Sequence, residues 1–106
     1  MGMTREVKYG YGYYIEEDEI NSFTDEKRDA FLENNYCHSI DSWSGNGYFF
    51  GIILKELDEG EIYRVPSFDS AFSVNEVKKM KETLKKDYPH LYYTHNIEHY
   101  MFYSVN

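Results

Sequence analysis

The chain has little of several features that mark common protein classes. Its 106 residues include one cysteine, Cys37, and two prolines. A single cysteine cannot form an internal disulfide, so we expect a reducing, cytoplasmic compartment. The sequence contains no run of about 18 apolar residues and no apolar signal-peptide core near its N-terminus. The sequence therefore predicts a chain without a membrane segment.

Basic charge is scarce as well. The chain has 11 lysine and arginine residues against 19 aspartate and glutamate residues, for a net charge of -8. The acidic excess lies in residues 1–70, with 15 acidic and 6 basic side chains, whereas residues 71–106 have 4 and 5. Because phosphate backbones repel such a surface, we expect no nucleic-acid partner. The charge is compatible with a basic protein partner, and solubility alone explains it equally well.

The segments that are present follow a recognisable order. Hydrophobic patterning predicts strand, helix, strand, strand, helix and strand, over residues 7–15, 25–34, 36–43, 48–54, 74–88 and an aromatic C-terminal stretch. That order is typical of the ferredoxin-like βαββαβ arrangement, an α+β fold. We therefore predict a single domain over residues 1–106, with an antiparallel sheet and two helices on one face. A short extra strand over residues 61–65 would add to this order.

Two of the predicted strands have distinctive faces. Residues 7–15 alternate between an aromatic face and a nearly bare face at Gly10 and Gly12. The bare face allows close packing, which we favour, or a shallow floor for a ligand. Residues 48–54 are apolar at consecutive positions, which predicts a central strand. The acidic residues 16–19 between these strands are expected to form a solvated loop.

Both predicted helices carry recognisable start signals. Thr24 is placed to cap the first helix, and Ser73 with Glu76 fits a capping box at the start of the second. Five apolar residues lie on one arc of the second helix: Val74, Val77, Met80, Leu84 and Tyr88. We expect Phe31 and Leu84 to lie in the core.

One short motif points to metal chemistry. His95, Glu98 and His99 form the pattern His-x-x-Glu-His, which resembles the zinc motif of the inverzincin peptidases. In that family the motif lies on a helix and needs a further acidic ligand downstream, whereas residues 91–93 and 100–103 here are predicted as strand. We favour two histidines at a bend. A metal site at His95 and His99 stays an alternative, with further ligands offered by His90, Cys37 and His38.

No catalytic set is evident in the sequence. Cys37 and His38 are neighbours in a predicted strand, so their side chains should point to opposite faces. Acidic residues such as Glu56, Asp58 and Glu61 lie in predicted turns without apolar neighbours, where a solvated rim is expected. The sequence predicts a protein that is not an enzyme and has no cofactor.

Aromatic residues supply the remaining functional signal. They make up 19% of the chain, with 12 tyrosines, and tyrosine is enriched at protein interfaces. The open face of the predicted sheet is expected to use five of them for association: Tyr9, Tyr11, Tyr13, Tyr100 and Phe102. We predict a small, acidic protein-binding domain from a bacterium or phage, such as an inhibitor, immunity or anti-defence protein. The alternatives are a metal- or small-molecule-binding protein and a structural homodimer.

Overall fold

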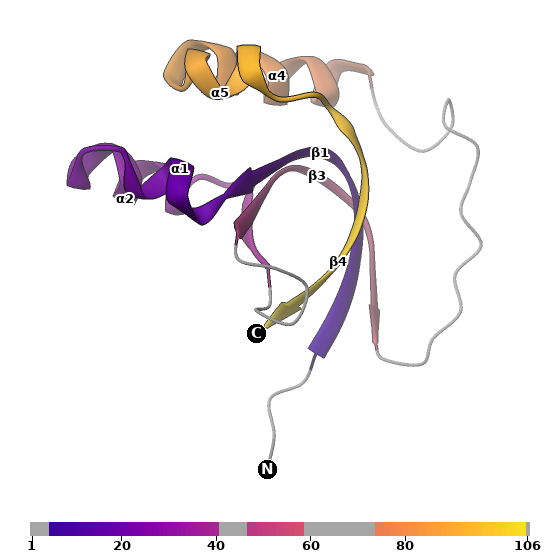
Figure 1. Ribbon diagram of the computed structural model, residues 1–106. Coiled ribbons are helices and arrows are strands. Elements are labelled where there is room, and N and C mark those ends of the chain that lie inside the picture. The colour runs from indigo at the N-terminus through magenta and orange to yellow at the C-terminus, as the bar shows by residue number, and fades with distance from the viewer. Residues whose placement is uncertain (1–4, 41–46, 59–73, 106) are drawn as a thin grey trace.

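The computed structural model describes residues 5–40, 47–58 and 74–105, which form an α+β structure with an antiparallel sheet (Figure 1). The sheet has four strands: β1 (Arg5–Glu16), β2 (Cys37–Ser39), β3 (Gly47–Asp58) and β4 (Glu98–Val105). The described helices are α1 (Glu17–Asn21), α2 (Asp25–Leu32), α4 (Val74–Asp87) and α5 (Pro89–Thr94). None of these helices is long and apolar enough to cross a membrane.

The strands lie in the order β2-β3-β1-β4, and every neighbouring pair is antiparallel. The two long strands β1 and β3 are therefore central, which confirms the position predicted from the apolar run. Strand β2 lies at an edge of the sheet, and it is only three residues long where the prediction was a strand over residues 36–43. The register of β1 against β3 shifts between Tyr9 and Gly10, where Leu54 is the extra residue of a bulge.

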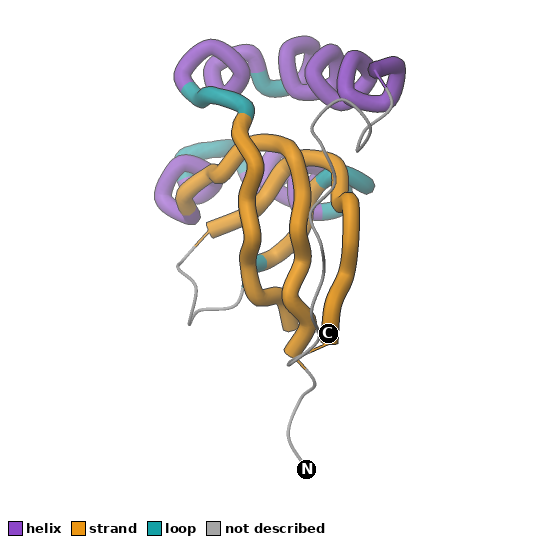
Figure 2. Tube along the Cα trace, turned by 90° about the vertical axis from the view of Figure 1, so that its right-hand side faces the viewer, coloured by secondary structure: helices purple, strands orange, loops and turns teal. Residues whose placement is uncertain are grey.

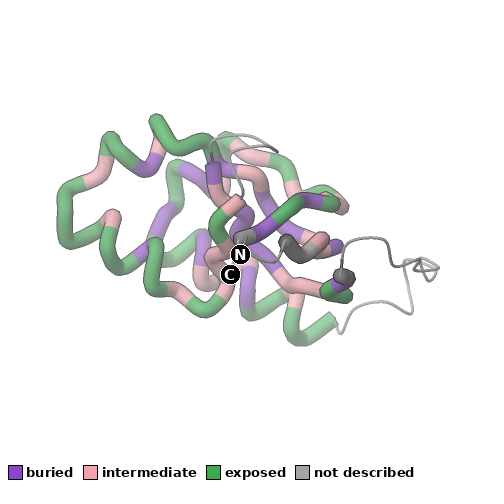
Figure 3. Tube along the Cα trace, turned by 90° about the horizontal axis from the view of Figure 1, so that it is seen from below, coloured by how far each residue is buried: buried purple, intermediate pink, exposed green. Residues whose placement is uncertain are grey.

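One hydrophobic core joins all four helices to the same face of the sheet. Buried side chains from the helices meet buried side chains from β1 and β3: Ile20, Phe31, Met80, Leu84 and Leu91 with Tyr13, Ile15 and Phe50. Phe31 and Leu84 are both 0% exposed, which confirms their predicted place in the core. Figure 3 shows exposed residues along the helices, interrupted by the buried positions that face this core.

The sheet is strongly bent, and the helices lie on its outer side. Figures 1 and 2 show α4 and α5 on the outer side of the bend. The strand ends that lie farthest from these helices extend away from them. The inner side of the bend brings the edge strands β2 and β4 into contact with each other. The inner face is therefore partly enclosed by the sheet itself.

Three glycines explain the close packing on the inner face. A side chain on Gly10, Gly12 or Gly51 would meet the ring of Phe49, since a Cβ there would lie 2.8, 3.0 or 2.7 Å from its Cζ. The ring thus lies directly against bare backbone and is 1% exposed. The structure therefore confirms the close packing that we favoured at Gly10 and Gly12.

Two segments differ from the sequence-based predictions. The expected acidic loop over residues 16–19 is the end of β1 and the start of α1. The backbone N–H of Glu16 donates to Glu19 Oε2 (3.0 Å), and carboxylates in a first turn are stabilised by the helix dipole. Residues 91–93 form helix α5 instead of a strand, because Pro89 is suited to a first helical position and Leu91 anchors the turn in the core.

Helix α4 begins at Val74 and ends just before Tyr88, and Met80, Leu84 and Tyr88 are buried as predicted. Val74 is 81% exposed, so the predicted apolar arc is wrong at its first position, the first residue of the helix. Thr24 caps α2 as predicted, because its Oγ1 accepts from the N–H of Lys27 (3.3 Å). The predicted cap at residue 73 and the extra strand over 61–65 involve residues outside the described part of the chain.

Candidate aromatic binding site

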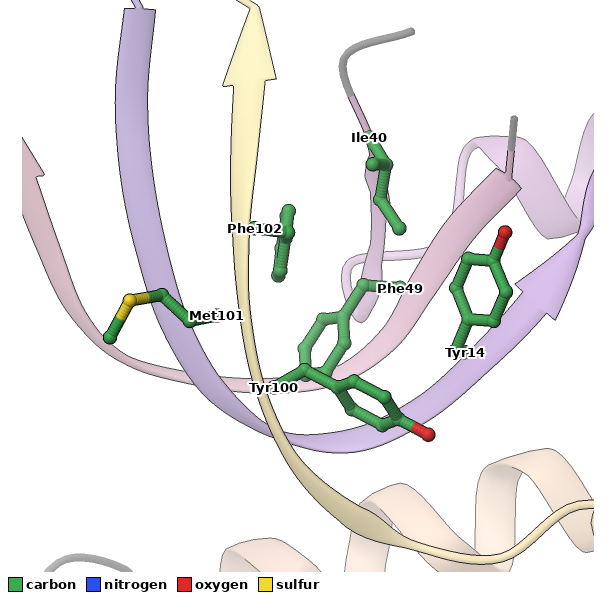
Figure 4. Close-up of a pocket in the computed structure, with 6 residues that line it drawn as sticks. All are labelled: Tyr14, Ile40, Phe49, Tyr100, Met101 and Phe102. Atoms are coloured by element: carbon green, nitrogen blue, oxygen red, sulfur yellow. The ribbon is translucent and has the colours of Figure 1, made fainter. Parts of the chain in front are cut away.

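The inner face of the bend contains an apolar pocket of about 230 Å³. Its walls come from the end of β1, the start of β3, the residue after β2 and the middle of β4 (Figure 4). The lining residues are Tyr14, Ile40, Phe49, Tyr100, Met101 and Phe102. Four of these are aromatic, so the pocket offers a predominantly apolar surface to a ligand.

Phe49 forms the base of this site. Its ring centroid lies 4.9 Å from that of Phe102 and 6.1 Å from that of Tyr100, both on β4. On the opposite side, the ring of His38 lies 6.1 Å away. Separations of this size are typical of favourable aromatic contacts. Because Phe49 is also held against the glycines, the base of the pocket is rigid and preformed.

The pocket lies along the middle of β4. Tyr100, Met101 and Phe102 are consecutive, and successive side chains of a strand point to opposite faces. Figure 4 accordingly shows the Met101 side chain pointing away from the other lining side chains, and it is 62% exposed. The part of Met101 that lines the pocket therefore lies near its backbone. In the described part of the chain β4 forms a hydrogen-bonded pair with β1 alone, and β2 contacts it across the inner side of the bend.

Acidic side chains lie next to the apolar pocket. Tyr14 is shared with a second, polar hollow of about 300 Å³, whose other lining residues are Glu16, Glu17 and Asp18. On the β4 side, the Tyr100 hydroxyl donates to Glu98 Oε2 (3.0 Å). Burial, and secondarily this hydrogen bond to a carboxylate, raises the pKa of Tyr100. The site therefore combines an aromatic base with a negatively charged rim.

The structure divides the predicted aromatic patch between two faces. Tyr9 and Tyr11 lie opposite Met101 and His99 of β4, on the outer face, whereas Tyr100 lies opposite Gly10 on the inner face. Phe102 is opposite Lys8 and so belongs to the inner face as well. Tyr13 is 3% exposed and part of the helix-covered core. Of the predicted interface residues, Tyr100 and Phe102 line the pocket.

The two histidines of the predicted metal pair have different partners. His95 follows α5, and its Nε2 lies 2.9 Å from Glu19 Oε2. His99 is in β4, where its Nδ1 lies 2.7 Å from the Tyr9 hydroxyl and its ring contacts Tyr11. The segment is a bend followed by a strand, as favoured from the sequence. Among the described residues, no three His, Cys, Asp or Glu side chains gather in a metal-binding group.

Cys37 and His38 point to opposite faces, as the strand pattern predicted. Cys37 pairs with Phe50 and packs against the core, whereas His38 pairs with Phe49 on the inner face. Burial raises the pKa of the Cys37 thiol to about 12. At neutral pH the thiol is therefore protonated, and a protonated thiol is a poor nucleophile.

Comparison with known proteins identifies no relative: no family model, no curated protein and no solved structure matches this chain. The site is therefore defined by its geometry. Sequence reasoning missed Tyr14, Ile40 and Phe49 as site residues. The signal that pointed to them was the bare face at Gly10 and Gly12, but the ring that covers those glycines comes from a different strand.

Proposed function

We propose that this chain is a non-enzymatic protein-binding domain that holds its partner at the aromatic pocket on the inner face of the sheet. The observation that carries this proposal is a preformed apolar pocket between β4 and Ile40, separate from the helix-covered core. Small-molecule sites usually enclose about 300–1,000 Å³. A pocket of about 230 Å³ is better suited to one side chain of a protein.

The same reasoning supports the class of protein that we propose. A small acidic inhibitor, immunity or anti-defence protein of a bacterium or phage acts by occupying a partner, and it needs a recognition surface without a catalytic group. The raised pKa of Cys37 and the tilted ring contact of His38 with Phe49 support the absence of a nucleophile at this strand. The central positions of β1 and β3 support a ferredoxin-like arrangement as the finer description of the fold.

Selection from a random heptapeptide library tests the proposal. Wild-type protein should enrich binding peptides, and Tyr100→Ser should weaken their binding by about tenfold or more, since Tyr100 lines the pocket. Tyr93→Ser is the matched control, because Tyr93 is a 71% exposed tyrosine on α5, away from the pocket. Thermal unfolding should show that both variants are folded.

Two results would contradict the proposal. One is a selection that enriches no peptide above background. The other is a set of peptides whose affinity for Tyr100→Ser equals their affinity for the wild type, because binding would then occur elsewhere on the surface.

A further inference from the structure

We propose that the side chain held in the pocket is an arginine of the partner protein, with its apolar stem against Phe49 and its guanidinium beside the acidic rim. This inference rests on the proposed function and names the chemistry of the bound group. Three features lead to it: the different exposure of the aromatic rings, the carboxylates beside the exposed ones, and the position of Tyr14 between pocket and rim.

The aromatic rings of the pocket differ in exposure. Phe49 and Phe102 are 1% and 6% exposed, and with Ile40 they form an apolar wall. Tyr14 and Tyr100 are half-buried, and their ring centroids lie 6.4 Å apart at a tilt of 45°. Figure 4 shows their hydroxyl groups on the side of the pocket where β1 ends. A ligand therefore meets the two tyrosines at this side and the apolar wall beyond them.

Carboxylates lie beside both tyrosines. The Tyr100 hydroxyl donates to Glu98 Oε2 (3.0 Å). Tyr14 also lines the polar hollow, together with three exposed carboxylates: Glu16, Glu17 and Asp18. No lysine or arginine is among the described residues that line either hollow. A cation at this side is therefore attracted both by carboxylates and by the faces of aromatic rings.

Tyr14 joins the apolar pocket to the acidic hollow, because its side chain lines both. Its ring lies against the backbone of Gly47, where a Cβ would be 2.9 Å from Tyr14 Cε1. A side chain that crosses this ring has apolar surface at one end and carboxylates at the other. Lysine and arginine both combine an apolar stem with a cationic head. Arginine fits better, because its guanidinium is weakly hydrated, stacks on aromatic rings and donates two hydrogen bonds to one carboxylate.

The charge at the rim also indicates which protein supplies the arginine. Because the carboxylates are exposed, the guanidinium keeps part of its hydration and avoids the large penalty of a buried charge. Exposed carboxylates add little affinity individually, but together they select partners of opposite charge. A second copy of this chain has the same net charge of -8 and is repelled. The favoured occupant is therefore an exposed arginine of a different protein.

Four peptides of the form acetyl-Gly-Ser-X-Ser-Gly-amide test this inference, with arginine, citrulline, lysine or leucine at X. Citrulline has nearly the shape of arginine without its charge. Titration of isotope-labelled protein, followed by amide NMR signals, should show shifts at residues 14–18 and 98–102. The arginine peptide should bind about threefold or more tightly than each of the others. The signals of its side-chain CH₂ groups should move upfield, because they lie over aromatic rings.

Variants at Tyr14 test the contact with the ring. Tyr14→Leu keeps an apolar side chain but removes the ring, so it should weaken the arginine peptide about threefold or more and leave the leucine peptide unchanged. Tyr14→Phe keeps the ring and should bind the arginine peptide as the wild type does. Tyr93→Leu, at the exposed tyrosine on α5, is the matched control. Thermal unfolding should show that all three variants are folded.

A charge variant tests the rim without altering the pocket. Glu17→Gln with Asp18→Asn should weaken the arginine peptide about threefold at low salt and leave the citrulline peptide unchanged. Glu26→Gln with Asp29→Asn on α2 is the matched control, since it changes the net charge equally at exposed positions away from the pocket.

Several results would overturn the inference. Citrulline or leucine peptides that bind as tightly as the arginine peptide would show that the pocket does not select a cation. Equal binding of the lysine peptide would overturn the choice of a guanidinium. An arginine peptide that shifts no amide of residues 14–18 or 98–102 would place no arginine in the pocket. In each case, library peptides that lose binding with Tyr100→Ser would still support the proposed function.

Discussion

The outer and inner faces of the sheet are filled in different ways. On the outer face, helices supply large side chains such as Phe31, Met80 and Leu84, which close a continuous core over β1 and β3. On the inner face, the sheet supplies its own cover, because Phe49 lies across three glycines and contacts Phe102 of β4. One face is sealed by other elements, and the other is covered by the bend of the sheet.

The two faces therefore differ in what their packing leaves open. The helix-covered part of the outer face buries the large side chains of the core, so it contributes most of the hydrophobic free energy. The inner face has too few large side chains to fill the bend, and an apolar pocket remains at the β4 edge. Substitutions on the two faces should therefore have different consequences.

The largest effect is expected in the outer core. Phe31→Ala should lower the free energy of unfolding by about 3–5 kcal/mol, because it removes a fully buried ring that contacts Phe50 and Tyr88. Leu32→Ala, at the next position on α2, is the control and should cost less than about 1 kcal/mol, since Leu32 is exposed. Urea unfolding measures both. Equal losses at the two positions would show that the core does not depend on the helix-covered face.

The next effect concerns the glycines of the inner face. Gly12→Ala should cost about 1–3 kcal/mol, because its Cβ would lie 2.4 Å from the backbone oxygen of Phe50, 2.5 Å from the Cα of Gly51 and 3.0 Å from Cζ of Phe49. Phe49→Leu removes the ring tip, so the double variant should lose less stability than the two single variants together. Strict additivity in urea unfolding would mean that the ring and the glycine do not pack together.

High pH should lower the free energy of unfolding. Burial raises the pKa of Tyr13 and of Cys37 to about 12, from 10.0 and 9.0. Above about pH 9 the unfolded chain loses these protons first, so stability is full below that pH and falls as pH rises toward 12. We expect a loss on the order of 1 kcal/mol between pH 8 and pH 10. Cys37→Ala should flatten this decline, and an unchanged decline would assign it to other groups.

The smallest effect is expected for the pair of Glu19 in α1 and His95, the residue after α5. Glu19→Gln removes the charge that faces His95 at 2.9 Å, and both side chains are partly exposed. Such pairs contribute between about 0 and 1 kcal/mol. Thermal unfolding, with the exposed Glu33→Gln as control, should show a shift of a few degrees at most. A larger loss would indicate that the pair holds the two helices together.

Local patterns predicted much of the fold. Consecutive apolar residues from 48 to 54 identified a central strand, because burial on both faces leaves no polar position. Thr24 identified the start of α2, since its hydroxyl can accept from a free amide nearby in the sequence. Residues 91–93 were mistaken for a strand because aromatic residues favour strands locally, while the burial of Leu91 under a helix is a tertiary effect.

The candidate site was only partly predictable. Tyr100 and Phe102, which line the pocket, were predicted as interface residues, but they were grouped with Tyr9, Tyr11 and Tyr13, which lie on the other face. The register between β1 and β4 decides which residues share a face, and a shift of one residue reverses the answer. The bulge after Tyr9 adds to this uncertainty, because it changes the pairing of β1 with β3.

The sequence by itself determined the acidic charge, the α+β class and the bare strand face at Gly10 and Gly12, because these depend on composition and on neighbours along the chain. Only the tertiary structure decided what covers that bare face. The ring of Phe49, from β3, covers the bare face, and the bend of the sheet places Ile40 and β4 on the two sides of one pocket. These contacts join residues far apart in the sequence, and they depend on strand register and on the curvature of the whole sheet, which no short segment specifies.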